Sequence, residues 1–170
     1  AAVSYDEDLS DYGTRNGVLV DDDPKAAHAP PLMWAEALDF LFEQMREDGV
    51  PLSEILAISG SGQQHGSVYM NAQAAKALSE LDSDQDLKAN LKGIFSRETS
   101  PIWMDSSTRI ECDEICESMG GMAVTAETTG STTFERFTGP QIRKFHKDCL
   151  EAYADTSSIG LVSSFMASVL

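Results

Sequence analysis

Basic residues are scarce in this sequence. Of its 170 residues only 12 are lysine or arginine, against 28 aspartates and glutamates, so the formal net charge is −16. Such a chain repels phosphate backbones and anionic lipids, which argues against nucleic-acid and membrane-surface partners. No apolar run approaches the roughly 20 residues of a membrane-spanning helix. The first residues, A-A-V-S-Y-D-E-D, also lack the basic and apolar stretches of a secretory signal.

Cysteine is scarce as well: there are three, Cys112, Cys116 and Cys149. An odd number at these spacings does not match a disulfide framework, and neither a nearby histidine nor a third cysteine completes a zinc set with Cys112 and Cys116. The acidic stretch Asp82–Asp86 fails as a calcium loop, because Leu87 and Gly93 stand where an EF-hand needs Gly and Glu. We therefore predict no metal site in this chain, and a reducing, cytoplasmic location.

Hydrophobic residues make up 42% of the chain, enough for a folded core, and the length fits one domain. The clearest element is a helix that opens at Pro30-Pro31, carries apolar residues at helical spacing, and ends at Asp48-Gly49. The apolar run Ile55–Ile58 then predicts a buried strand of a parallel sheet. With a strand also expected before the helix, the order of strand, helix and strand is typical of an α/β fold.

Other elements are expected on both sides of this unit. Strands are predicted at residues 2–6, 18–20, 67–70, 101–104 and 159–162, and helices at 108–119, 122–128 and 141–150, while residues 72–95 form a variable helical or loop segment. Thr108 with Glu111, and Thr138 with Gln141, have capping-box spacing. Ser163-Ser164 is expected to cap a final helix.

The richest candidate for chemistry is the loop Ile58–Gly66, I-S-G-S-G-Q-Q-H-G. Its glycines let the backbone turn sharply and approach a ligand, and Gln63, Gln64 and His65 offer neutral donors and acceptors. This chemistry suits an uncharged, polyhydroxylated ligand. The spacing is not that of a dinucleotide fingerprint, and no Gly-Lys-Ser/Thr marks a phosphate loop. The alternative is a tight structural turn with a surface histidine.

Arg136 is the second candidate. It stands between two phenylalanines, just before a predicted helix, where its planar fork could bind hydroxyls or an anion. From the residues alone, an ion pair with one of the many acids is the preferred interpretation. Trp103 and Asp105 lie at the end of a predicted strand. From the residues alone, Trp103 is expected in the core, and Asp105 either caps a helix or contacts a ligand.

Four stretches in this order resemble one known family: S-G-S-G-Q-Q-H-G-S-V-Y, S-P-I-W-M-D-S-S-T, F-E-R-F-T-G-P-Q-I-R-K-F and L-V-S-S-F-M-A-S-V-L. They resemble the sugar-binding lobe of the FGGY carbohydrate kinases, and within that family most closely the eukaryotic xylulokinases. The resemblance extends over nearly the whole chain and is weakest at residues 71–98.

The resemblance implies an α/β fold that is part of an actin-like, ribonuclease-H-like ATPase domain. It implies transfer of the γ-phosphoryl group of ATP, with Mg²⁺, to a sugar hydroxyl, giving xylulose 5-phosphate from D-xylulose. Gln64, His65 and Arg136 match sugar-contacting residues of the family. Trp103 and Asp105 match a segment that lines the sugar side. The resemblance thus reverses the preference for an ion pair at Arg136.

The resemblance also implies parts that residues 1–170 do not contain. A phosphate-loop hairpin is expected before Ala1, and the catalytic aspartate and the nucleotide lobe after Leu170. We therefore expect a partial sugar-binding domain, truncated at both ends and inactive alone, with ATP and Mg²⁺ bound mainly by the missing parts. Two alternatives stay open: a related kinase for ribulose, gluconate or glycerol, and a non-catalytic sugar-binding or interaction module.

Overall fold

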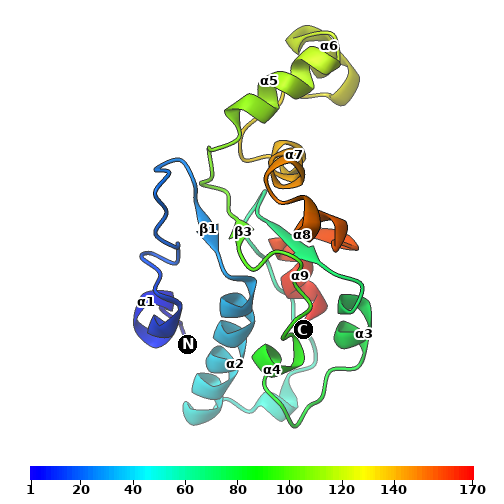
Figure 1. The fold of residues 1–170 in the computed structure, drawn as a ribbon. Coiled ribbons are helices and arrows are strands. Elements are labelled where there is room, and N and C mark those ends of the chain that lie inside the picture. The colour runs from blue at the N-terminus through cyan, green and yellow to red at the C-terminus, as the bar shows by residue number, and fades with distance from the viewer.

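The computed structural model describes all residues 1–170 and shows a mixed architecture of helices and short strands (Figure 1). β1 (His28–Ala29) pairs with β3 (Ser100–Pro101), and β2 (Ser67–Met70) pairs with β4 (Ser158–Leu161), both antiparallel. The mixture of helix and strand is as predicted, but the parallel sheet is wrong. Ile55–Ile58 forms no ladder with any strand and is largely exposed.

Helices surround these strands and account for most of the regular structure. They are α1 (Tyr5–Asp8), α2 (Pro31–Glu47), α3 (Ala74–Ser79), α4 (Leu87–Asn90), α5 (Arg109–Ser118), α6 (Met122–Thr129), α7 (Thr138–Asp148), α8 (Leu150–Ala154) and α9 (Val162–Ser168), with 3₁₀ turns at Ser10–Tyr12 and Leu52–Glu54. No helix is both long and apolar enough to cross a membrane.

α2 is the longest helix and confirms its prediction. Pro31 occupies the first turn, where a missing N–H costs nothing, and Gly49 follows the helix with a left-handed φ of 77°. Met33, Trp34 and Ala37 are buried on the face that meets the rest of the chain. Burial of one such large apolar side chain contributes about 1.5–3 kcal/mol, so this face anchors α2.

The hydrophobic core joins α2 to the β2–β4 sheet and to α9. Its central residues, Met33, Val68 and Phe165, are at most 1% exposed. Leu91 and Ile94, which follow α4, are also buried there. The core therefore packs α2, α9 and the segment after α4 against the β2–β4 sheet.

Several terminal and capping predictions are wrong. Residues 2–6 do not form a strand; α1 begins at Tyr5, and the Asp6 carboxylate accepts hydrogen bonds from the Thr14 hydroxyl and the Gly17 N–H. Residues 18–20 form only an isolated bridge between Val18 and Arg15. A short polar side chain that binds nearby backbone competes with strand formation in this segment.

The proposed caps use their side chains elsewhere. The Thr108 hydroxyl donates to the backbone oxygen of Glu135 at 2.5 Å, not to its own helix. The Gln141 amide donates to Asp105 at 2.6 Å, and Ser163-Ser164 lies inside α9, which begins at Val162. Tertiary hydrogen bonds have replaced local caps at Thr108 and Gln141.

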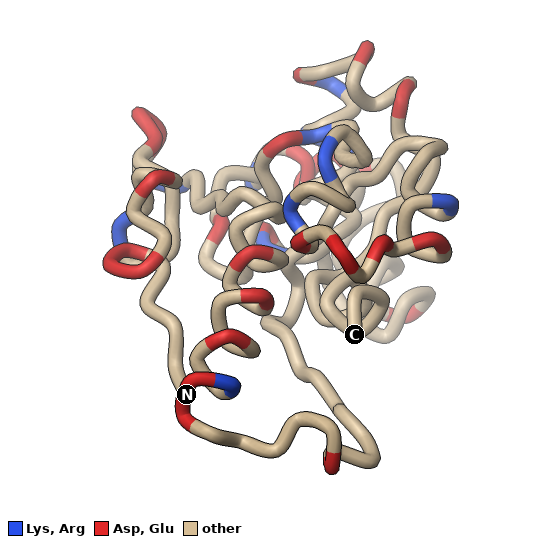
Figure 2. Tube along the Cα trace, turned by 90° about the horizontal axis from the view of Figure 1, so that it is seen from below, with Lys and Arg blue, Asp and Glu red and all other residues tan.

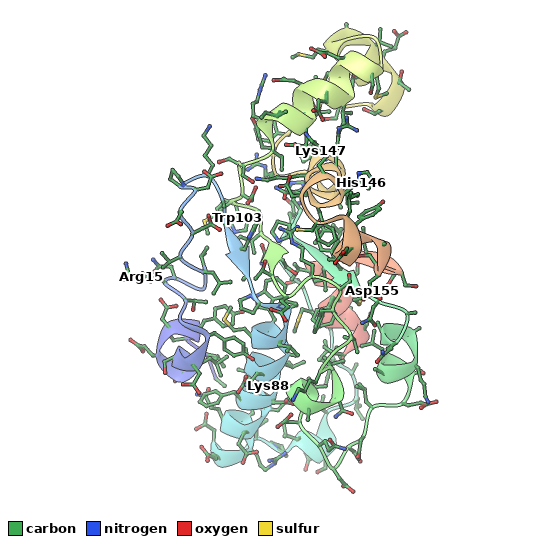
Figure 3. The ribbon with its side chains drawn as sticks, in the orientation of Figure 1. Arg15, Lys88, Trp103, His146, Lys147 and Asp155 are labelled. Carbon is green, nitrogen blue, oxygen red and sulfur yellow. The ribbon has the colours of Figure 1, made fainter.

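α5 and α6 project from the body as an arm, and α5 packs on α7. Lys147 of α7 donates to the buried carboxylate of Glu111 at 2.8 Å and to Glu114 at 3.0 Å (Figure 3). Arg143 donates to the same Glu114 at 2.6 Å. Acidic residues are distributed over the remaining surface, with few basic neighbours (Figure 2). The basic residues of α7 thus serve as internal partners for α5.

Candidate binding site

Five side chains, from three separate segments of the chain, line a pocket of about 380 Å³. They are Gln63, Gln64, His65, Trp103 and Arg136. The family resemblance marks four of them, and Gln63 comes from the same polar loop as Gln64 and His65. Loops after β3 and before β2 and α7 bring them together. We call this cavity the polar pocket, since only one of its five lining residues is hydrophobic.

The loop before β2 lies directly against the start of α9. A Cβ added at Gly62 would be 2.7 Å from the Cα of Ser163, closer than real atoms approach. The backbone N–H of Val162 also donates to the oxygen of Gly66 at 2.9 Å. Glycine is therefore required at position 62 for the loop to contact α9 and present the next residues to the polar pocket.

His65 has a strained backbone, with φ at 67° in the left-handed region that disfavours side chains with a Cβ. Its ring packs on Phe137, with centroids 4.9 Å apart. No protein hydrogen bond engages its ring nitrogens, so they are available to a ligand as donor and acceptor. Strain of this kind persists where the surroundings hold a side chain in place, which favours the ligand role over a surface turn.

Trp103 lies in the wall of the polar pocket and is 49% exposed, so its predicted place in the core is wrong. Its backbone N–H donates to the Gln63 side-chain oxygen at 3.1 Å. That bond ties the glycine-rich loop to the loop after β3. Sequence spacing gives no sign of this contact, although Gln63 stands within the I-S-G-S-G-Q-Q-H-G loop.

Arg136 forms no ion pair, contrary to the alternative considered from the sequence. The neighbouring Glu135 carboxylate is 3.6 Å from Arg109 instead. The Arg136 guanidinium carbon lies 4.7 Å from the centroid of the Phe134 ring, and its Nε is buried with no hydrogen-bond partner. A buried donor left unpaired costs about 1–3 kcal/mol, so an acceptor in the polar pocket would stabilise this arrangement.

Asp105 does not reach the polar pocket. It is 1% exposed, and its carboxylate accepts hydrogen bonds from the Ala27 N–H at 2.9 Å, from the Gln141 amide at 2.6 Å and from both the N–H and the hydroxyl of Ser107. His28 lies 3.3 Å away. Burial alone raises the pKa of a carboxyl, but these donors outweigh it and hold the Asp105 pKa well below its usual range.

The polar pocket can therefore recognise a neutral polar molecule. Amide and imidazole groups both donate and accept hydrogen bonds, as sugar hydroxyls do, and a guanidinium donates to a carbonyl or hydroxyl oxygen. No carboxylate lines the pocket. No group of three or more histidine, cysteine or acidic side chains in the structure could hold a metal ion. A small polyol fits these features.

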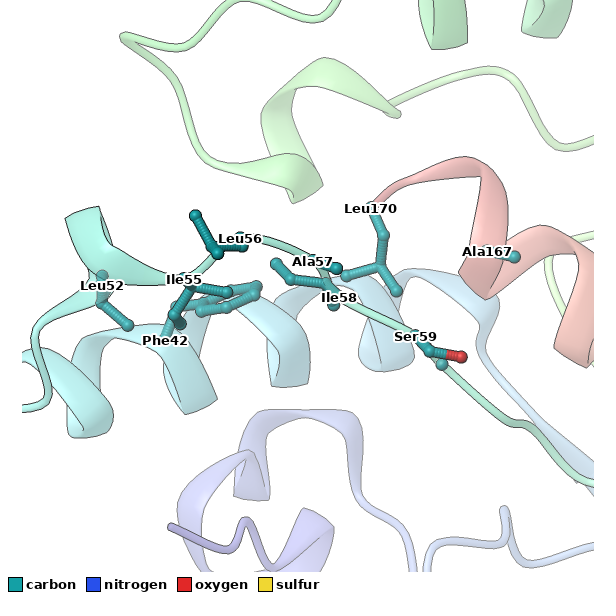
Figure 4. Close-up of a pocket in the computed structure, with 10 residues that line it drawn as sticks. Phe42, Leu52, Ile55, Leu56, Ala57, Ile58, Ser59, Ala167 and Leu170 are labelled. Carbon is teal, nitrogen blue, oxygen red and sulfur yellow. The ribbon is translucent and has the colours of Figure 1, made fainter.

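A second and larger cavity, of about 630 Å³, lies beside the extended segment Ile55–Gly60. Its walls are apolar and include Phe42, Leu56 and Leu170 (Figure 4). We call it the apolar groove. It offers no converging polar side chains, so its size does not make it the better candidate for binding a polar ligand.

Known proteins resemble this chain closely. It is 46% identical over 169 residues to xylulose kinase 2 of Arabidopsis thaliana, 45% over 168 residues to xylulose kinase of Rattus norvegicus, and 45% over 165 residues to D-xylulose kinase A of Aspergillus niger. The chain is similar to part of the xylulose kinases. The alignments cover 97–99% of this chain and 29–31% of those enzymes, so it spans about 30% of the length of the curated relatives it matches.

The fold comparison agrees. A crystal structure of a xyloylose kinase from Brucella ovis matches 87% of this chain and 26% of its own chain, with a TM-score of 0.65 and 18% sequence identity. At this identity the match supports the fold alone. No family model matches the chain. The resemblance to xylulose kinases predicted from four sequence stretches is thus confirmed.

Proposed function

We propose that this chain is the sugar-binding part of a xylulose kinase, which transfers the γ-phosphoryl group of ATP to D-xylulose. The observation that carries the proposal is the polar pocket, in which Arg136 has a buried Nε and no acidic partner. An acidic chain with 28 carboxylates would readily pair an arginine that had only a structural role. The similarity to curated xylulose kinases supports the choice of sugar.

Each lining residue has a distinct role in this proposal. Gln64 and His65 hydrogen-bond to sugar hydroxyls from one side. Arg136 donates to the carbonyl or a hydroxyl from the other, with its plane set by Phe134. Trp103 forms the wall between them, as half-exposed aromatic side chains do in ligand sites.

The phosphoryl-transfer machinery lies outside these residues in our proposal. Transfer requires a phosphate cradle, Mg²⁺ and a residue that positions the nucleophile or accepts its proton. The only buried aspartate near the polar pocket, Asp105, already has protein partners for its carboxylate, and no metal-binding cluster is present. We infer that ATP, Mg²⁺ and the catalytic aspartate belong to the remaining length of the kinase, in an actin-like, cytoplasmic enzyme.

Kinetics of the full-length kinase test the sugar site. Arg136→Ala and His65→Asn should each lower kcat/KM for D-xylulose by the equivalent of ~1–3 kcal/mol, with a smaller change in the KM for ATP. Asparagine tolerates the left-handed backbone at position 65. Arg143→Met is the matched control, since Arg143 pairs with Glu114 away from the pocket. Unchanged sugar kinetics in both site variants would disprove the assignment.

The unmodified kinase tests the substrate. A panel of D-xylulose, ribulose, gluconate and glycerol should give the highest kcat/KM with D-xylulose. Preference for another sugar would move the protein to a different carbohydrate kinase specificity, a distinction that rests on a small free-energy difference between similar polyols. Absence of phosphorylation with every sugar would indicate a non-catalytic binding module.

A further inference from the structure

We propose that Asp105 and Gln141 act as a positioning clamp that orients Arg136 in the polar pocket. Neither residue lines the pocket, and both are almost fully buried, at 1% and 2% exposure. The inference rests on the proposed function, because it assigns a role in sugar binding to residues that do not touch the sugar. It replaces the direct contact that the sequence predicts for Asp105.

Gln141 joins two acceptors through one amide group. Its Nε2 donates to the Asp105 carboxylate at 2.6 Å and to the backbone oxygen of Glu135 at 3.1 Å. A glutamine amide carries two N–H donors, so both are used. Because Gln141 belongs to α7 and is buried, the amide cannot turn to water without breaking both bonds. It therefore connects the anion to the backbone that precedes Arg136.

The Glu135 oxygen is held from a second direction. The Thr108 hydroxyl donates to it at 2.5 Å from the residue before α5. Two buried side-chain donors on one backbone oxygen restrict the peptide unit that links Glu135 to Arg136. That unit contains the Arg136 backbone nitrogen, so its orientation determines the direction in which the arginine side chain leaves the backbone.

Arg136 needs this support, since no hydrogen bond or ion pair in the protein holds its charged group. It has no ion pair, its Nε has no acceptor, and the Phe134 ring contacts it only through a face. A guanidinium without hydrogen-bond partners can take many orientations unless the backbone that carries it is held in place. Holding that backbone keeps the guanidinium directed at the pocket before the sugar arrives, which reduces the conformational entropy lost on binding.

Asp105 also closes the turn that contains Trp103, through its backbone. The backbone N–H of Asp105 donates to the oxygen of Ile102 at 2.9 Å, closing the turn that contains Trp103. Asp105 also receives the Ala27 N–H from the segment before β1. Asp105 thus joins the Trp103 turn through its backbone and, through its carboxylate and Gln141, the backbone that precedes Arg136. The spacing between the two walls of the pocket depends on the clamp.

A double-mutant cycle in the full-length kinase tests the clamp. Gln141→Leu should raise the KM for D-xylulose about tenfold in the unmodified background. It should raise KM much less in the Arg136→Met background, because the clamp acts through Arg136. Combined with His65→Asn, the effects should multiply. Gln73→Leu, at an exposed position outside the pocket, is the control. Equal effects of Gln141→Leu in all backgrounds would overturn the proposal.

Thr108→Val provides a milder variant in case Gln141→Leu does not fold. It keeps the volume of the side chain and removes one donor to Glu135, and it should shift KM in the same direction by a smaller factor. An unchanged KM in Thr108→Val, measured on a folded protein, would also contradict the clamp.

Hydrogen exchange tests the clamp without sugar. Amides of residues 131–138 should exchange faster in Gln141→Leu and Thr108→Val, while those of α2 should not change. If the kinase failed to phosphorylate D-xylulose, the proposed function would be wrong, yet faster exchange would still support the clamp. Unchanged exchange at 131–138 would overturn the clamp even if D-xylulose proved to be the substrate.

Discussion

The buried polar cluster around Asp105 and the apolar groove beside Ile55–Gly60 occupy the same chain and differ in what specifies them. In the cluster, each oxygen of the Asp105 carboxylate has at least two donors within 3.3 Å. Along the groove, Leu56 is 100% exposed and Ile58 is 53% exposed. One region has its polar groups paired, whereas the other leaves apolar surface in water.

The positions of the segments are fixed in different ways in the two regions. Hydrogen bonds to a buried anion are directional, so they fix the distances between the segments they join. Apolar contact is not directional, and Ile55–Gly60 has an extended backbone with no strand beside it. We therefore expect substitutions in the cluster to change both stability and sugar binding, and substitutions along the groove to change association between molecules.

The largest effect should come from Asp105→Ala. It leaves the Ala27 N–H, the Gln141 amide and the His28 ring without their acceptor, and loss of one partner from a buried charged cluster destabilises by about 3–5 kcal/mol. Urea unfolding measures the change. Asp113→Ala is the control, because Asp113 forms an exposed pair with Arg109. Equal midpoints for the two variants would remove the distinction between cluster and surface.

Acid should weaken the cluster in a related way. The Asp105 pKa is lowered in the folded state, so above the unfolded pKa of roughly 4 the carboxylate contributes its full stabilisation. As pH falls below that value the unfolded chain takes up the proton first, and the contribution is lost progressively towards the folded pKa. Unfolding free energy measured between pH 6 and 2 should fall less steeply in Asp105→Asn. Parallel curves would contradict this assignment.

Gly62→Ala, in the loop between the apolar groove and the polar pocket, should have an intermediate effect on stability. The added methyl would lie 2.7 Å from the Cα and 2.8 Å from the backbone nitrogen of Ser163, so the loop must move from α9. Overpacking of this kind costs about 1–3 kcal/mol and should raise the KM for D-xylulose. Gly139→Ala is the matched control, since a Cβ there meets nothing within 4 Å. A thermal melt and sugar kinetics distinguish the two.

Leu56→Ser should have the smallest effect on stability, within about 0.5 kcal/mol, because the side chain is already in water. It should lower concentration-dependent light scattering of residues 1–170, since exposed apolar surface promotes association. Leu91→Ala, at a fully buried position, should instead cost about 2–5 kcal/mol. Loss of stability in Leu56→Ser comparable to that in Leu91→Ala would show that Leu56 is not exposed.

Elements with local signals were predictable from the sequence. α2 was bounded by Pro31 and Gly49, α5 ended near Gly120-Gly121, and α6 began at Met122 as expected. The strand predicted at Ile55–Ile58 is absent, because a strand exists only with a partner and an apolar run does not reveal whether one is present. The antiparallel pairing of β2 with β4 was likewise hidden, since it joins residues about 90 positions apart.

The residues of the candidate site also differ in whether the sequence predicts them. His65, Gln64 and Arg136 stood in motifs whose local chemistry and family resemblance marked them. Gln63 and Gln141 act through contacts across 40 and 36 positions, to Trp103 and Asp105, and no local pattern reports such contacts. The capping-box spacing at Gln141 even suggested a different use for its amide. Long-range hydrogen bonds decided which polar residues support the site.

The left-handed backbone at His65 has a consequence for how the chain balances stability against binding. Glycine at this position would relieve roughly 1 kcal/mol of backbone strain, but it would lose the packing of the ring on Phe137 and would make the unfolded chain more flexible. The backbone strain is what the fold gives up to hold an imidazole at the edge of the polar pocket. Under the proposed function, the chain tolerates that strain because the imidazole serves sugar binding.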